Sequence, residues 1–102
     1  MNRTVVDIDR ELAFWRRAYR SEPEVSDYVC FVDLEPAIRV VIAGYMSTPE
    51  AEFEALEAEL ARDYEHARGV SILPWDDVRN ICRRAFQRLQ QTYGTQAPPV
   101  RT

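Results

Sequence analysis

Four arginines between positions 79 and 88 of this 102-residue chain have the type and spacing to bind phosphate groups. Arg79 and Arg83 are four residues apart, as are Arg84 and Arg88, so on a helix each pair would form a patch of positive charge. Such patches bind nucleic acid best when exposed aromatic rings lie beside them. The aromatic residues of this segment instead fall on its apolar stripe, which predicts that they are buried. Nucleic-acid binding through these arginines is therefore the alternative hypothesis.

An acidic segment precedes these arginines and offers them partners within the chain. Positions 50 to 65 contain seven acids and one arginine, a net charge of −6, against +4 for the four arginines. We expect the arginine charge to be matched within the chain or by solvent. The acidic face itself is a candidate binding site for a basic partner protein, although glutamate also fills solvated helix faces simply because it favours helices. The residues that represent this face are Glu52, Glu54, Glu59 and Asp63.

Other residue types show no spacing that predicts catalysis. His66 is the single histidine, and it falls at the end of a predicted helix, where a cation is favoured by the helix dipole. The three glycines are too far apart for a phosphate-binding loop. The carboxylates fall on positions expected to be exposed, so they mark neither an acid–base pair nor a metal site. We expect no enzyme activity, catalytic residue, metal or cofactor.

The cysteines and the N-terminal residues give information about the cellular compartment of the protein. Cys30 and Cys82 have apolar neighbours and no C-x-x-C spacing, which favours buried, reduced thiols over a disulfide. The N-terminus carries acids where a signal peptide would be apolar. The longest apolar run, 40–46, is far shorter than the roughly 20 residues of a membrane span. These features predict a cytoplasmic protein without membrane contact.

The elements that position these residues are predicted to be helices. Apolar residues make up 46% and charged residues 29% of the sequence, as in soluble globular domains. Apolar side chains recur at three- and four-residue steps over 5–20, 49–67 and 74–92, which predicts three helices. We expect one domain over 1–93 and a flexible polar tail over 94–102.

Capping signals suggest where the predicted helices begin and end. Thr4 is the expected cap of the first helix, and Gly69 the expected end of the third. The segment 47–50 combines a hydroxyl cap with Pro49, which is typical of a helix start.

The stretch from 28 to 46 allows two interpretations. Its β-branched residues would suit a hairpin over 28–45. A helix over 34–46, with Pro36 in its first turn, would be the central helix of the fold and buried nearly all round. We predict this helix, and hence an all-α four-helix bundle, with an α+β fold as the alternative. On the outer side of the helix Val40, Ile42 and Met46 would form an exposed apolar strip, a possible homodimer seam.

The chain also resembles an uncharacterised family of small bacterial proteins. The similarity covers roughly residues 27 to 90 and includes "EPAIR", "ELARDYE" and "PWDDVRNICRRAFQRL". The resemblance implies an all-helical, cytoplasmic bacterial protein and carries no activity. The positions that match are Tyr28, Pro36, Ala37, Arg39, Glu59, Arg62, Asp63, Tyr64, Glu65, Trp75, Asp76, Val78, Arg79, Ala85, Phe86 and Arg88.

Taken together, the sequence predicts a non-enzymatic protein-interaction or regulatory module. Its contacts are expected at the acidic helix face, at the apolar seam, or at both. Self-association and binding of another protein are both open, and nucleic-acid binding is the second function class.

Overall fold

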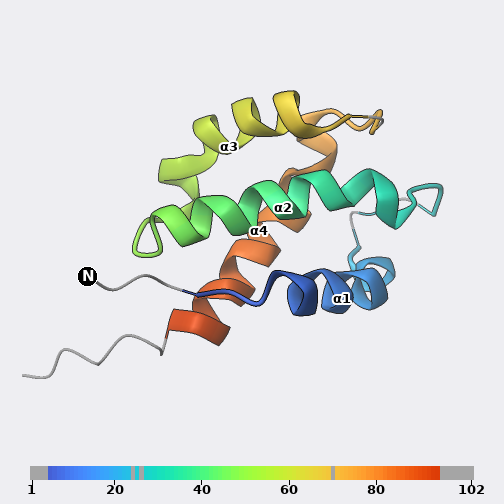
Figure 1. The fold of residues 1–102 in the computed structure, drawn as a ribbon. Coiled ribbons are helices and arrows are strands. Elements are labelled where there is room, and N and C mark those ends of the chain that lie inside the picture. Colours follow the sequence, from blue (N-terminus) through green and yellow to red (C-terminus); the bar gives the residue numbers. More distant parts are fainter. Residues whose placement is uncertain (1–4, 24, 26, 70, 95–102) are drawn as a thin grey trace, which may run out of the picture.

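The computed structural model describes residues 5–23, 25, 27–69 and 71–94 (Figure 1). Over these residues the chain forms helices and connecting loops and no strand, so the predicted all-α four-helix bundle is confirmed. The hairpin alternative over 28–45 is wrong, because one continuous helix occupies that stretch. The elements are α1 (Ile8–Ala18), a short 3-10 turn η1 (Tyr19–Ser21), α2 (Phe31–Ser47), α3 (Phe53–Ala67) and α4 (Trp75–Tyr93).

Helix α2 is the centre of the fold. It packs against α1, α3 and α4, and Figure 1 shows α1 and α3 on its opposite sides while α4 crosses behind it. The prediction of a central helix is therefore confirmed, but the helix is not buried nearly all round, because Val32, Arg39 and Ala43 leave one side of it exposed. Val40 and Ile42 are part of the core, and Met46 is half-buried against it. The expected exposed strip at these three positions is wrong, because these side chains lie on the sides of α2 that pack against the other helices.

The first helix begins later than predicted. The carboxylate of Asp7 accepts a hydrogen bond of 3.1 Å from the backbone N–H of Arg10, which caps a helix that starts at Ile8. Val5, predicted to be helical and apolar-facing, is exposed and precedes the helix. The predicted cap, Thr4, lies outside the described residues, as does the predicted tail after Gly94.

The boundary between α2 and α3 also differs from the prediction. Helix α2 starts at Phe31, so Pro36 lies inside the helix and not in its first turn. Its last turn extends to Ser47, because the N–H of Thr48 donates to the carbonyl of Gly44. The segment 47–50 therefore ends one helix, and α3 begins only at Phe53. Gly69 ends α3 as predicted, with a positive φ of 56°.

Side chains of α2, α3 and α4 form the centre of the core. The ring of Phe86 on α4 meets Tyr45 and Phe53 edge-on, at centroid distances of 5.7 and 5.9 Å. Helices α2 and α3 approach closely at Gly44, where an added Cβ would lie 2.7 Å from Leu60 Cδ2. The absence of a side chain at Gly44 is what allows this approach.

The two cysteines have different environments. Cys82 is fully buried in the core, as predicted, and burial raises the pKa of its thiol far above the usual range. Cys30 is exposed, so the prediction of a buried thiol there is wrong. It precedes the first residue of α2 and therefore does not share the inward-facing stripe of that helix. Both cysteines are free thiols.

No helix within the described ranges has the length and apolar character needed to cross a membrane.

Candidate functional site: a groove between α2 and α4

Two of the four arginines of α4 face α3. Both the Nε and the NH2 group of Arg79 donate to the carboxylate of Glu57, which also accepts a 3.1 Å hydrogen bond from the indole N–H of Trp75. Arg83 pairs with Glu54 and lies over the ring of Phe53. The expected charge match between α3 and α4 is present at these two positions.

The other two arginines face the N-terminal segment, which the sequence did not suggest. Arg84 Nε lies 2.5 Å from Glu22 Oε1, just after the 3-10 turn η1. Arg88 Nε donates to Glu11 Oε1 over 2.8 Å, and its guanidinium stacks on Phe14, 3.6 Å from the ring centroid. Each arginine of α4 is therefore engaged by a carboxylate of its own chain.

Glu11 is a buried charge that the sequence pattern missed. Its side chain is only 1% exposed, although the carboxylates were expected to lie on the surface. The Tyr93 hydroxyl donates to Glu11 Oε2 over 3.3 Å, and the same hydroxyl accepts from the backbone N–H of Asp7. Arg88 and Tyr93 thus supply the partners that a buried carboxylate requires. This cluster ties α1 to α4 and is structural.

The predicted acidic face of α3 is present but shows no pocket of binding size. All four of its residues are exposed, and Glu54 is already occupied by Arg83. Glu59 and Asp63 border a small hollow of about 130 Å³ beside Gly44. These carboxylates lie on an open helix face, as solvated glutamates commonly do.

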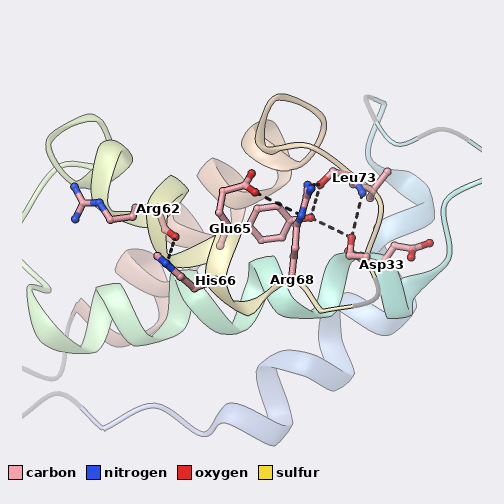
Figure 2. Close-up of polar contacts among 8 residues, drawn as sticks. Asp33, Arg62, Glu65, His66, Arg68 and Leu73 are labelled. Carbon is pink, nitrogen blue, oxygen red and sulfur yellow. Dashed lines mark hydrogen bonds and ion pairs between the residues drawn. The ribbon is translucent and has the colours of Figure 1, made fainter.

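A different feature emerges where the loop between α3 and α4 meets the start of α2. The hydroxyl of the buried Ser71 donates to the carbonyl of Asp33 over 2.9 Å. The carbonyl of Leu73 accepts hydrogen bonds from Tyr64 Oη at 2.7 Å and Arg68 NH1 at 2.9 Å. Figure 2 shows Asp33, Arg68 and Leu73 converging in this network. Burial raises the pKa of the Tyr64 phenol, which keeps this donor protonated.

This network holds residues on both sides of Ile72 while Ile72 itself faces outward. Ser71 and Leu73 are fixed by the hydrogen bonds described above, and the side chain of Ile72 is 82% exposed. At the same end of the molecule Tyr28 is 93% exposed. Figure 2 also shows a contact between His66 Nδ1 and the carbonyl of Arg62, farther back on α3, in keeping with a structural role for that histidine.

Ile72 and Tyr28 flank a groove of about 390 Å³, which we call the Ile72 groove. Three segments build it: the approach to α2 with its first turn, the loop between α3 and α4, and the first turns of α4. Its apolar lining residues are Val25, Tyr28, Val29, Leu34, Ile72 and Leu73. Its polar lining residues are Asp33, Asp76, Asp77 and Asn80.

The ionisable groups of the Ile72 groove define what it can do. They are three aspartates and one tyrosine, with no nucleophile–base pair and no basic residue among the lining residues. Within the described ranges no group of His, Cys, Asp and Glu is arranged to hold a metal ion. The groove therefore offers binding chemistry: apolar contact on its walls and negative charge at its rim.

Sequence reasoning missed the Ile72 groove because it lies between elements. Ile72 falls in the seven-residue connection 68–74 between α3 and α4, outside every helical stripe. A large apolar residue in a short loop was the one available signal. Its exposure depends on Tyr64 and Asp33, which fix the loop from two other segments.

No protein family, curated protein or solved structure was found to match this chain. The resemblance to a bacterial family therefore stays a prediction.

Proposed function

We propose that this protein is a non-enzymatic protein-interaction module that docks a segment of a different protein in the Ile72 groove. The observation that carries this proposal is the exposure of Ile72 between two anchored neighbours. A loop held in place by hydrogen bonds loses little conformational entropy when it binds, which favours its use as a preformed contact. An apolar side chain of the partner would lie against Ile72, which is 82% exposed, and shield it from water.

The charge of the groove favours a different protein over a second copy of this chain. A two-fold dimer brings the same surface of each copy together. At the Ile72 groove such a dimer would bring Asp33, Asp76 and Asp77 against their own counterparts, and like charges in a partly desolvated interface are unfavourable. The predicted seam at Val40, Ile42 and Met46 gives little support to self-association, because Val40 and Ile42 are in the core.

The nucleic-acid alternative has less support. The guanidinium groups of Arg79, Arg83, Arg84 and Arg88 each pair with a carboxylate of the same chain. A phosphate would have to displace that carboxylate, which reduces the gain from each contact. A protein with a net charge of −4 also repels the nucleic-acid backbone at long range.

Selection of peptides tests the proposal directly. The purified protein would be used to select from a phage-displayed library of random 12-residue peptides, and selected sequences would be synthesised and titrated. We expect peptides whose affinity falls at least tenfold with Ile72→Ser, because that change removes apolar contact without touching the core. Val5→Ser is the matched control, since it also removes an exposed apolar side chain, and we expect it to leave affinity unchanged.

Two results would overturn the proposal. One is a selection that yields no peptide binding in the micromolar range. The other is a set of selected peptides that bind Ile72→Ser as tightly as the unchanged protein.

A further inference from the structure

We infer that the segment docked in the Ile72 groove carries a positively charged side chain directly beside its apolar anchor. This inference rests on the proposed function and names the chemical class of its partner: a basic, amphipathic protein segment. The observation behind it is that three carboxylates line a largely apolar groove, while no arginine or histidine among the described residues lines it.

The carboxylates of the groove lack the partners that other acids of this protein have. Glu11, Glu22, Glu54 and Glu57 all form ion pairs with arginines of α4. Among the described residues, no ion pair involves Asp33, Asp76 or Asp77. The acids along the α4 seam are therefore neutralised within the fold, whereas those at the groove are open to an external cation.

The cations near this end of the molecule are already engaged. Arg68 lies against Glu65 and donates to the carbonyl of Leu73. Arg79 feels the charge of Asp76, one turn away, but its hydrogen bonds go to Glu57. Neither guanidinium is free to turn toward the groove without breaking contacts that the fold already makes.

Helix dipoles explain part of the charge at the groove but not all of it. Asp33 lies in the first turn of α2, and Asp76 and Asp77 lie in the first turn of α4, where carboxylates favour the helix dipole. Each helix N-terminus contributes about half a positive charge. Two termini thus offset roughly one of three negative charges, which leaves about two for a cationic partner.

The apolar walls and the carboxylates of the groove have different roles in binding. The apolar walls supply affinity by removing carbon surface from water. The carboxylates supply selection, because an acidic segment would meet like charge and a basic one opposite charge. Since these charges are partly exposed, their attraction weakens as salt rises.

Three synthetic 12-residue probe peptides test the charge class. One alternates leucine with lysine, one alternates leucine with glutamate, and one alternates serine with lysine. We expect only the leucine–lysine peptide to bind well, with an affinity that falls severalfold between 50 and 300 mM salt, on the order expected for a few screened charges. Binding would be followed by calorimetry and by NMR shifts at Ile72 and Asn80.

Two charge-matched triple variants place the binding site. The first variant removes three charges from the groove by combining Asp33→Asn, Asp76→Asn and Asp77→Asn. We expect it to bind the leucine–lysine peptide at least tenfold more weakly. The second variant removes three charges from the acidic face of α3 by combining Glu52→Gln, Glu59→Gln and Asp63→Asn. We expect its affinity for the same peptide to fall less than twofold. Asn80→Asp adds one charge to the groove with little risk to folding, and we expect it to tighten binding severalfold.

The outcomes separate this inference from the proposed function. If library peptides selected through Ile72 are neutral or acidic, or the leucine–glutamate peptide binds as well as the leucine–lysine peptide, the charge class is overturned and the docking function stands. If both triple variants lose affinity equally, the attraction is to the acidic protein as a whole, and the inference fails. If nothing depends on Ile72, the proposed function itself fails.

Discussion

Two ion pairs of α4 consist of the same residue types, an arginine and a glutamate, but differ greatly in their exposure to solvent. Arg83 pairs with Glu54 and Arg88 pairs with Glu11, and both arginines also stack on a phenylalanine ring. The side chain of Glu54 is 57% exposed, whereas that of Glu11 is 1% exposed. The difference teaches that burial of the carboxylate, and not the pairing itself, decides what each arginine contributes. A solvated carboxylate loses little when its partner leaves, but a buried one has no water to replace it.

Arg88→Ala should destabilise the protein more than any other single substitution in these two ion pairs. It leaves Glu11 buried with only the Tyr93 hydroxyl as partner and removes the stacking on Phe14. Because Arg88 is itself partly exposed, we expect a loss of about 2–3 kcal/mol in the free energy of unfolding, somewhat less than for breaking a fully buried pair. Urea unfolding followed by circular dichroism would measure it.

Arg83→Ala is the matched control for that comparison, because it removes the same side chain from the same helix. We expect a change in the unfolding midpoint close to the error of the measurement. Leu in place of both Glu11 and Arg88 should restore much of the stability lost in Arg88→Ala, since no buried charge is left behind. If Arg83→Ala and Arg88→Ala lost equal stability, burial of the paired carboxylate would not decide what each arginine contributes.

Gly44→Ala tests whether packing, more than charge, holds α3 in place. The added Cβ would come within 2.7 Å of Leu60 Cδ2, so the buried Leu60 side chain would have to shift. We expect a net loss of about 1 kcal/mol, after the better helix propensity of alanine has offset part of the overpacking. Gly94→Ala is the control, because no atom lies near its added Cβ and its φ is negative. A more stable Gly44→Ala protein would show that the helices separate without penalty.

The smallest expected effect is the pH dependence of the α3–α4 ion pairs. Hydrogen bonds from Arg79 and then Trp75 hold the pKa of Glu57 below its usual range. A lowered folded-state pKa adds stability above the unfolded-state pKa, and that stability is lost as pH falls through the folded-state pKa. Unfolding midpoints measured from pH 6 to pH 3 should therefore fall less steeply in Glu57→Gln than in the unchanged protein. Parallel curves would show that the pair is too solvated to matter.

The fold class followed from the sequence because helical periodicity is a local signal. The stripe that includes Val78, Cys82 and Phe86 predicted the core-facing side of α4, and all three residues are buried. Gly69 ends α3 as expected, since its positive φ is a property of a few neighbouring residues. The helix starts were less predictable: 47–50 suits a helix start and a turn equally well, and the hydrogen bond from Thr48 to Gly44 decides between them.

What could not be predicted depends on residues that are far apart in the chain. Glu11 is flanked in sequence by Arg10 and Leu12, so no pattern separates it from the exposed glutamates. Its burial follows from Arg88, 77 positions later. The Ile72 groove likewise needs three separate segments to meet. The acidic face of α3, which is continuous in sequence, was easy to identify, but the hollow that it borders is only about a third the size of the Ile72 groove.

The contacts among Asp7, Glu11, Arg88 and Tyr93 bring the beginning and the end of the described chain together. The contacts among α2, α3 and α4 join positions that are closer together in the chain. Joining Glu11 to Arg88, 77 positions apart, costs more chain entropy than joining residues of the other three helices. The contact between α1 and α4 is therefore the least favourable one to form before the rest of the bundle has folded. Helix α1 is therefore the element expected to dock last during folding and to detach first when the protein opens.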